Sequence, residues 1–344
     1  MTDEELLKWG QTSLRAFRDR GIRRNLELRA ELMKCLRSIL DKEDFVEVDT
    51  PILRYYEDPT ENPPFVTLGV GGWPRFHLRT CPEEYTRRST CVFDKAYEIG
   101  KCFRNETNRF SGAQRSHIPE FTMVEIYEVD VDLEGALRCI EQTVRCLVRE
   151  VHDGWIVQYQ EEKLDFREPF QRIKVLDALE KCGEPKAIEF VAMHRTAPPE
   201  FISGEDQKLE SLIKKYIEPG LIQPTFLTHF PKSADQLPDR NEGNEVQRAE
   251  LIVAGKELGE VGALQPDSEI LRKHCVAAIR ERYGHTLDDS LVDIDYLAEL
   301  KAFNRAVGGG AIGIDRLLML LCDTNDIRDV VWYPFVGQFL EGRD

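Results

Sequence analysis

The sequence predicts an α+β fold, a mainly antiparallel sheet flanked by helices, in a chain of 344 residues. Segments with the alternating pattern of strands follow one another at 96–104 and 120–129, and again at 249–253 and 256–261. Few helical crossovers separate these neighbours, and antiparallel strands need none. Segments with helical periodicity before and after the strands supply the flanking layers.

The other expected elements follow from local patterns. Leucines recur at helical spacing in 26–40, which predicts a helix with one buried face. The segment 45–51 alternates as a strand that ends at Pro51, since proline cannot extend the hydrogen-bond ladder. In chain order, the remaining elements are a strand at 75–79, a helix at 133–151, strands at 225–229 and 309–314, and helices at 268–282 and 315–322.

Composition limits the class of protein. Lys and Arg number 46 against 62 Asp and Glu, a net charge of −16, which disfavours a protein that coats nucleic acid non-specifically. Nine cysteines without a Cys-x-x-Cys pair argue against a disulfide framework and a tetrathiolate zinc site. The sequence has no apolar run near the roughly 20 residues that span a bilayer and no secretory leader pattern, so we expect a cytoplasmic protein without membrane contact.

The first segment with chemistry comprises the two strands around 97–106 and 117–127. Phe121, Glu125 and Tyr127 share one face of the second strand, because side chains alternate along it. With Arg104 at the end of the first strand, this face could bind a planar, anionic ligand that carries an amine. The alternative is a surface lattice of ion pairs with incidental aromatic rings.

The second segment spans 247–260. If Ala254 and Gly255 form a two-residue hairpin turn, Glu250 lies opposite Gly259, and Glu257 lies diagonally from it on the same face. Two carboxylates suit Mg²⁺, which binds proteins through one or two acids together with substrate phosphates. The alternative is a pair of solvated surface acids.

The third segment is rich in glycine. Gly308, Gly310 and Gly313 match G-x-G-x-x-G, but a dinucleotide fold requires a closely preceding strand and a following βαβ unit, which the context lacks. A strand that allows close approach of a ligand, followed by a helix opening at 315–316, fits better. A cation in the first helical turn is disfavoured by the helix dipole, so Arg316 is expected to meet an anion.

Together these segments resemble the catalytic domain of class II aminoacyl-tRNA synthetases, in the lysyl-tRNA synthetase branch. The stretch Val48-Asp-Thr-Pro51 is similar to motif 1 of that class, Phe103-Arg-Asn-Glu106 with Pro119-Glu-Phe-Thr122 to motif 2, and 310–316 to motif 3. Leu78-Arg-Thr-Cys-Pro-Glu83, Gln223-Pro-Thr-Phe226 and Ile327-Arg-Asp-Val330 match further stretches of the branch. The resemblance covers roughly 20–335 and implies a catalytic domain at 23–344 and a homodimer. The residue pattern itself predicts a lead-in helix at 1–22 and an insertion at about 163–222, where short helical pieces are broken by proline and glycine.

The resemblance also implies roles for individual residues. ATP and Mg²⁺ would be bound here, and the amino acid would attack the α-phosphorus without help from a protein nucleophile. The implied positions are Arg104 (α-phosphate) and Arg316 (γ-phosphate) as catalytic residues; Phe121 under adenine, with Glu106, His117 and Arg115 beside the nucleotide; Glu250 and Glu257 on Mg²⁺; and Glu83, Glu125, Tyr127 and Glu260 around the amino acid, with Glu83 or Glu125 near its ammonium. Arg109 is an alternative to Arg115 as the loop arginine.

Two departures from the branch shape the expected function. In the branch, an anticodon-binding barrel precedes the catalytic domain, whereas here only about 20 residues precede it. A related free-standing ligase, which attaches lysine to elongation factor P, also lacks that barrel. The branch pattern Asn-Gly-Phe-x-Glu is replaced by Glu260-Val-Gly-Ala-Leu264, so Glu260 could serve a shorter or differently placed amine.

These departures lead us to expect an amino-acid ligase that forms an aminoacyl-adenylate and passes it to a protein lysine or a small-molecule amine. The runner-up is a minimal synthetase that charges tRNA, and a third possibility is a non-catalytic amino-acid sensor or regulator. The complete set of ATP and metal residues argues against the third.

Overall fold

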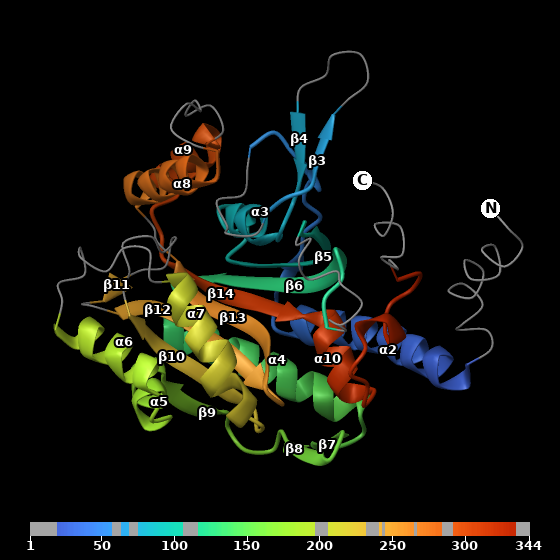
Figure 1. Cartoon of the computed structure of the whole chain (residues 1–344). Helices are drawn as coiled ribbons and strands as arrows, with labels where there is room; N and C mark the ends of the chain where they lie inside the picture. The colour runs from blue at the N-terminus through green and yellow to red at the C-terminus, as the bar shows by residue number, and fades with distance from the viewer. Residues whose placement is uncertain are drawn as a thin grey trace, which may run out of the picture.

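A nine-stranded sheet forms the centre of the computed structural model, with strand order β1-β5-β6-β14-β13-β12-β10-β9 and β11 paired to β12 (Figure 1). The structure describes residues 19–56, 63–68, 75–105, 116–196, 206–231, 241–242, 245–264, 267–283 and 292–334. The strands are β1 (Val46–Glu47), β5 (Lys95–Phe103), β6 (Glu120–Val129), β9 (Gln171–Lys174), β10 (Thr225–Pro231), β11 (Asn241–Glu242), β12 (Glu245–Val253), β13 (Lys256–Leu264) and β14 (Val307–Gly313). Only the β1–β5 and β9–β10 pairs among these described strands are parallel, which confirms the predicted α+β class.

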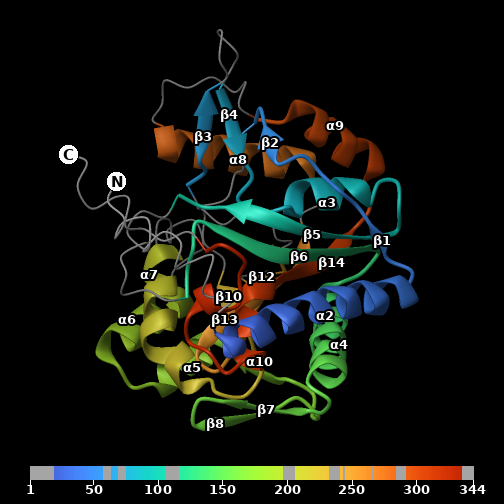
Figure 2. The ribbon, with the colours of Figure 1, turned by 90° about the vertical axis from the view of Figure 1, so that its right-hand side faces the viewer.

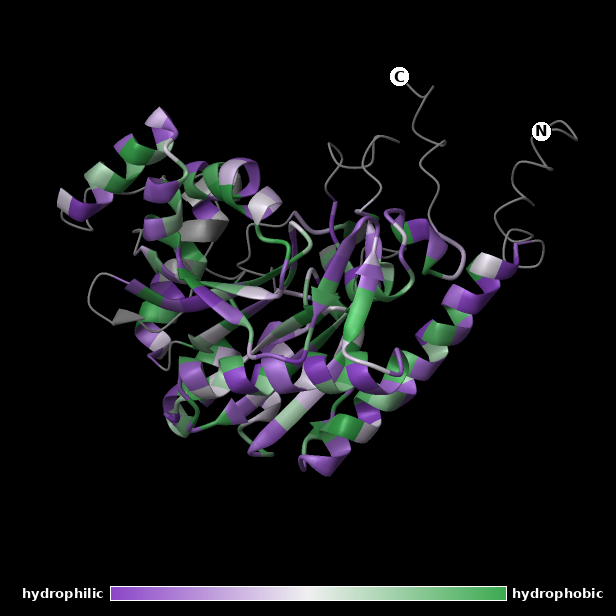
Figure 3. Ribbon diagram, turned by 90° about the horizontal axis from the view of Figure 1, so that it is seen from below, coloured by the Kyte–Doolittle hydropathy of each residue, from purple (hydrophilic) through white to green (hydrophobic). Residues whose placement is uncertain are grey.

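Three helices cover one face of the sheet: α2 (Arg20–Lys42), α4 (Leu133–Val151) and α10 (Ile314–Leu321) (Figure 2). Asp19 caps the N-terminus of α2, because its carboxylate accepts hydrogen bonds from the backbone amides of Gly21 and Ile22. Apolar and polar residues follow each other along every part of α2, which is the helix nearest the N label in Figure 3. Its leucines, such as Leu32 and Leu36, pack with Val124 and other buried strand residues in the main core.

The opposite face is covered at its β10–β12 end. Helices α5 (Val175–Lys181), α6 (Pro185–Thr196) and α7 (Asp206–Leu212) lie there, followed by the π-helix η3 (Ile213–Ile217) and the 3₁₀-helix η4 (Glu218–Gly220). Their apolar residues form a second core with Leu227 and Ile252 of the sheet. Helix α3 (Glu83–Ser89) packs on the same face at β5 and β6. Between these two sets lie the polar side chains of the candidate site.

Smaller units complete the described structure. Helices α8 (Ser268–Tyr283) and α9 (Ile294–Phe303) pack on each other and meet α3, where Arg88 forms ion pairs with Asp293 and Glu299 at 2.7 and 2.8 Å. A three-stranded sheet consists of β2 (Leu53–Arg54), β4 (Arg75–Leu78) and β3 (Val66–Leu68). Strands β7 (Ile156–Tyr159) and β8 (Glu162–Asp165) form a hairpin, and η6 (Ile327–Asp329) follows α10.

The long periodic segments were predicted with bounds close to those observed, whereas shorter ones differ. The strand expected at 45–51 is reduced to Val46–Glu47, and α3 and α9 were not anticipated. The segment 163–222 contains strand β9 and most of β8 in addition to helices, and its limits as an insertion stay a prediction. Residues 1–18 of the expected lead-in helix lie outside the described residues. Among the helices that the structure describes, none combines the length and apolarity needed to cross a bilayer.

Candidate active site

One row of residues across the sheet brings four glutamates to the same face. Glu98 of β5 pairs with Glu125 of β6, and Glu125 pairs with Ala311 of β14. Ala311 pairs with Glu260 of β13, which pairs with Glu250 of β12. Directly opposed residues of antiparallel strands point to the same side of a sheet. The row therefore concentrates negative charge in the middle of this face.

A β-bulge in the β12–β13 hairpin adds a fifth carboxylate to the face. The expected pairing of Glu250 with Gly259 is wrong by one residue, because the register shifts at Leu258 and Glu250 instead lies opposite Glu260. The extra residue lets Glu257 and Glu260, three positions apart, point to one side, which strict alternation would forbid. The predicted placement of Glu250 and Glu257 on one face is confirmed.

Two predicted residues from distant segments, His117 and Glu257, contact Arg316. Its Nη2 lies 3.0 Å from Nε2 of His117, and its Nη1 donates a hydrogen bond to the backbone carbonyl of Glu257 at 2.5 Å. The Glu257 carboxylate lies 3.7 Å from the same Nη1. Partial burial would raise the pKa of Glu257, but Arg316 and Arg104 outweigh this effect and hold the pKa below its ordinary value. This end of the site is therefore cationic and suited to phosphate groups.

Arg104 and Phe121 also lie together. The guanidinium carbon of Arg104 lies 5.0 Å from the centroid of the Phe121 ring, within cation–π range, and its Nε donates to the carbonyl of Thr80 at 3.3 Å. A nucleotide whose base stacks on Phe121 would thus have a guanidinium beside it. Glu106 and Arg115, as well as the alternative Arg109, lie outside the described residues.

A buried acid and a tyrosine form the other end of the site. The Tyr127 hydroxyl donates to Oε2 of Glu125 at 2.8 Å, and Glu125 is only 2% exposed. Burial, and next the charge of Glu83 in the first turn of α3, raise the pKa of Glu125 well above its ordinary value. A cation bound here would relieve this repulsion. Gly309 makes room for the tyrosine, because a Cβ at that position would lie 2.3 Å from Cδ1 of Tyr127.

Arg248 is a site residue that the sequence analysis missed. Its Nη2 donates to Glu250 at 2.9 Å, its Nε lies 2.6 Å from a carboxylate oxygen of Glu260, and its guanidinium lies over the ring of Phe230. Glu260 therefore already has a cationic partner, which weakens the idea that it receives a substrate amine alone. The alternation of side chains along a strand could have identified Arg248, because it lies two residues before Glu250 and therefore shares its face.

The carboxylates of Glu250 and Glu257 fit a metal ion whose coordination is completed by oxygen atoms of the substrate. No group of three or more His, Cys, Asp or Glu residues that could hold a metal occurs in the described parts of the chain. Glu250 and Glu257 lie on one face, which suits Mg²⁺ with phosphate oxygens as further ligands. Burial raises the pKa of Glu250 to about 8, with Arg248 opposing and Glu257 adding to the shift. A divalent cation would favour the ionised form of both acids.

A buried ion pair supports Arg316 from behind. Asp315, its neighbour, forms an ion pair with Arg29 of α2 and accepts a hydrogen bond from the backbone of Thr122 at 2.7 Å. Arg29 also donates to the Thr122 hydroxyl at 2.8 Å and to the carbonyl of Val330 at 3.1 Å. Arg29 falls in the buried stripe of α2, the position at which an arginine calls for an internal partner. These contacts fix the start of α10 to β6, next to Phe121.

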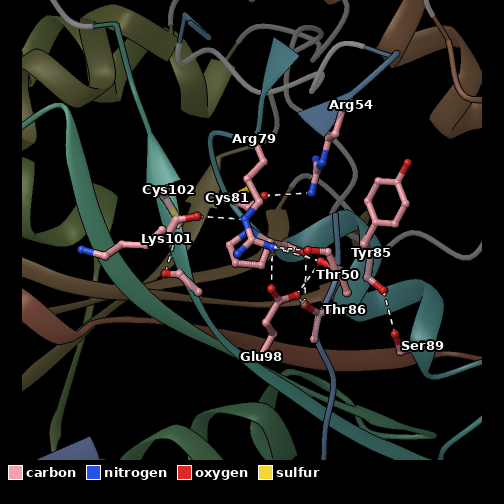
Figure 4. Close-up of polar contacts among 12 residues, drawn as sticks. Thr50, Arg54, Arg79, Cys81, Tyr85, Thr86, Ser89, Glu98, Lys101 and Cys102 are labelled. Carbon is pink, nitrogen blue, oxygen red and sulfur yellow. Dashed lines mark hydrogen bonds and ion pairs between the residues drawn. The ribbon is translucent and has the colours of Figure 1, made fainter. Parts of the chain in front are cut away.

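A second buried ion pair supports the segment that carries Glu83 (Figure 4). Arg79 donates to Glu98 at 2.5 Å, to the Thr50 hydroxyl at 3.0 Å and to the carbonyl of Lys101 at 2.8 Å. The Thr50 hydroxyl in turn donates to Glu98 at 2.5 Å. Gly100 leaves space for this arginine, because a Cβ there would lie 2.2 Å from Nη2 of Arg79. Glu98 is thereby neutralised, although it stands in the acidic row.

Comparison with known proteins identifies the family of the chain. Residues 5–337 match the family model described as tRNA synthetases class II (D, K and N). Relatives include proteins named lysine–tRNA ligase from Clostridium tetani (30% identical, covering 95% of this chain and 67% of the relative) and Clostridium perfringens strain SM101 (32%, 89% and 63%). A third, from Mycoplasma genitalium, is 30% identical over 89% of this chain and 64% of its own length.

The chain thus spans about two thirds of the length of these relatives, and slightly less in two of the three cases. The family match, in contrast, extends over nearly the whole chain and includes every segment that builds the site. The chain belongs to the class II tRNA synthetase family of the D, K and N group.

Proposed function

We propose that this protein is an ATP-dependent amino-acid ligase that forms an aminoacyl-adenylate and releases pyrophosphate. The observation that carries the proposal is the meeting of Arg104, Phe121, His117, Glu257 and Arg316, from four separate segments, near the buried carboxyl group of Glu125. The cationic end suits a nucleoside triphosphate, and the acidic end suits an ammonium group.

The reaction needs positioning more than covalent help from the protein. A carboxylate oxygen of the amino acid bonds to the α-phosphorus while the bond from that phosphorus to the pyrophosphate oxygen breaks. Arg104 would stabilise the charge on the α-phosphate, and Arg316 the charge on the γ-phosphate. Mg²⁺ held by Glu250 and Glu257 would supply further neutralisation of the phosphates. Glu83, Glu125 and Tyr127 would orient the amino acid through its ammonium.

The family and its relatives favour tRNA as the acceptor over the protein lysine or small-molecule amine that the sequence analysis placed first. All three relatives described above bear the name lysine–tRNA ligase. We therefore propose lysine, or an amino acid with a similar amine, as the substrate and tRNA as the acceptor. Glu260, in its pair with Arg248, marks the place where amino-acid choice can differ from that of the relatives.

We further propose a cytoplasmic homodimer. All nine cysteines are free in the part of the chain that the structure describes, as expected for a reducing compartment. Apolar side chains stand exposed along the segment that follows the motif 1 strand, including Ile52, Leu53 and Tyr55. A second copy of the chain would cover them.

The decisive experiment is ATP–pyrophosphate exchange, scanned over all standard amino acids and several diamino acids. We expect exchange with one or a few amines of the lysine type, and a loss of about 100-fold or more in Arg316→Ala, the scale for removing one transition-state donor. The matched control is the exposed Arg195 of α6, which forms an ion pair with Glu180 of α5. The variant Arg195→Ala should keep full activity.

Absence of exchange with all of these amino acids, in folded wild-type protein, would contradict the ligase proposal. The non-catalytic sensor would then be the better explanation. If exchange occurs, the adenylate is then offered to total tRNA and to a protein extract. Labelled tRNA supports the acceptor proposed here, whereas labelled protein with unlabelled tRNA overturns it.

A further inference from the structure

One arginine side chain joins three segments of the chain that lie next to the site (Figure 4). The guanidinium of Arg79 donates to the Glu98 carboxylate at 2.5 Å and to the carbonyl of Lys101 at 2.8 Å, both in β5. It also donates to the carbonyl of Thr50 at 3.2 Å, and the backbone amide of Arg79 donates to the carbonyl of Ile52 at 3.0 Å. Arg79 therefore fastens the segment before α3 to the segment 50–52 and to β5.

The ion pair between Arg79 and Glu98 is shielded from water. Both side chains are 3% exposed. A guanidinium is almost never buried to this extent without partners, and here carboxylate, carbonyl and hydroxyl oxygens from two segments of the chain surround it. Because these acceptors stand in fixed directions, they allow the guanidinium one orientation. The chain on either side of Arg79 is held with it.

The partner carboxylate of Glu98 extends the connection into α3. The Thr86 hydroxyl lies 3.4 Å from an oxygen of that carboxylate and 3.1 Å from the carbonyl oxygen of Pro82, and Thr86 is fully buried. Pro82 immediately precedes Glu83, the first residue of α3. The buried pair therefore contacts the segment of Glu83 from both sides, through the chain at Arg79 and through α3 at Thr86.

The same pair lies next to the buried Glu125. Glu98 is directly opposite Glu125 across β5 and β6, so the two carboxylates are on one face of the sheet, and each residue is 2% exposed. Two like charges in this position repel each other unless one of them has a partner. Arg79 supplies that partner for Glu98, so the charge of Glu125 stays available to a bound cation.

We propose that Arg79 is a positioning residue for the amino-acid substrate. It does not contact the substrate, but it holds the segment 80–83 against β5 and so sets the place of the Glu83 carboxylate relative to Glu125. This inference rests on the proposed function, in which Glu83 and Glu125 receive the ammonium group. Two acids that bind one ammonium need the correct spacing, and a displacement of about 1 Å can lower activity by a factor of about 100.

The first test is Arg79→Met, which keeps much of the side-chain volume but removes every hydrogen bond of the guanidinium. In ATP–pyrophosphate exchange with lysine as the probe, we expect the KM for lysine to rise about tenfold or more. The KM for ATP should change by less than about threefold, because the ATP residues are anchored independently. Arg104 is held by its backbone amide, which donates to the carbonyl of Pro119 at 3.0 Å, and Arg316 lies on α10.

Arg29→Met provides the matched comparison, because Arg29 and Asp315 form a buried ion pair of the same kind at the other end of the site. This variant should also destabilise the protein. It should raise the KM for ATP instead of the KM for lysine, since Arg316 directly follows Asp315.

The double variant Arg79→Met, Glu98→Gln separates positioning from charge balance. It leaves no buried charge of the pair without a partner and should recover part of the stability that Arg79→Met loses. Its KM for lysine should stay raised, because the contacts of the guanidinium with Thr50 and Lys101 remain absent.

Hydrogen–deuterium exchange measures the positioning directly. Backbone amides of α3 and of the segment 80–82 should exchange faster in Arg79→Met and in the double variant than in wild type, whereas those of α4 should change less.

A normal KM for lysine in the folded double variant would overturn the proposal and leave Arg79 only as a partner for the charge of Glu98. An equal rise of this KM in Arg29→Met would also overturn it, since the effect would then reflect general loosening of the protein. Unchanged hydrogen exchange in α3 would overturn it as well. Wild-type protein without any ATP–pyrophosphate exchange would contradict the proposed function instead, and hydrogen exchange would still decide whether Arg79 positions Glu83.

Discussion

Glu125 lies buried between other acids, with one hydrogen bond from Tyr127 and the charge of Glu83 close by. Its raised pKa means that the folded protein holds this proton to a higher pH than the unfolded chain does. Stability is therefore lost as the pH rises from the ordinary carboxyl pKa through the raised value. The ammonium of a bound substrate would compensate the charge of Glu125 and so remove this loss of stability.

Glu125→Gln tests this account because it keeps the shape and the contact with Tyr127 but removes the charge. We expect the variant to match wild type near pH 4 and to become more stable than wild type by about 1 kcal/mol or more at pH 8. Its KM for the amino acid should rise by roughly thirtyfold or more, as for loss of a desolvated charge pair. Urea unfolding at the two pH values and exchange kinetics provide the measurements.

Glu120→Gln is the control for this prediction, because Glu120 is an exposed residue of the same strand that pairs with Lys101 at the surface. It should change neither the pH dependence nor the KM. A Glu125→Gln variant that loses stability at pH 8 would show that the carboxylate is ionised and favourably paired in the folded protein.

At the scale of single residues, the sequence predicted which side chains share a face of a regular strand and was wrong about a pairing that depends on register. Phe121, Glu125 and Tyr127 share a face because β6 is regular. The pairing of Glu250 with Glu260 depends on a bulge at Leu258, and no local pattern marks which residue of a hairpin bulges.

Arg29 joins four parts of the chain that are far apart in sequence. Through Asp315, Thr122 and Val330 it connects α2, α10, β6 and the segment after η6. The ion pair is buried, so removal of one partner leaves an uncompensated charge in the core. It also fixes the first turn of α10, which carries Arg316.

We predict that Arg29→Met lowers the free energy of unfolding by about 3–5 kcal/mol, whereas the double variant Arg29→Met, Asp315→Asn recovers part of the loss because no charge is left unpaired. Urea unfolding measures both. Arg23→Met serves as the control, since Arg23 forms an exposed pair with Glu27 on the same helix and should matter by less than about 1 kcal/mol. A loss in Arg29→Met no larger than in the control would mean that the pair contributes no net stability.

Helices and strands were predictable where they are long enough for the hydrophobic pattern to repeat several times. Helix α4 and strand β6 were predicted with the bounds observed, since each is long and periodic. Helix α3 has seven residues and begins without a side-chain cap, and β1 has two residues held by parallel pairing to β5. Such short elements owe their conformation to tertiary contacts, which a local reading of sequence does not contain.

On the scale of the whole molecule, the small sheet β2–β4–β3 connects an apolar surface to the site. Val66 and Leu68 share one face of this sheet, and Leu68 is 71% exposed, whereas Leu53, 52% exposed, lies on the other face; Tyr55 is exposed just after β2. From the same strand β2, Arg54 donates to the carbonyl of Cys81 at 3.1 Å, two residues before Glu83. Burial of this surface by a second copy of the chain would therefore steady the segment that carries Glu83.

Leu68→Glu should consequently separate the proposed dimer and weaken catalysis together. A charge placed in an apolar interface is left desolvated and unpaired, so we expect sedimentation of a monomer where wild type sediments as a dimer. The KM for the amino acid should rise several-fold, while ATP affinity changes little because Arg104 and Arg316 lie on other elements. Ile188→Glu, at an exposed apolar residue of α6, is the control and should leave both properties unchanged. A wild-type monomer at all concentrations would refute the homodimer, and a fully active monomeric Leu68→Glu would refute its connection to the site.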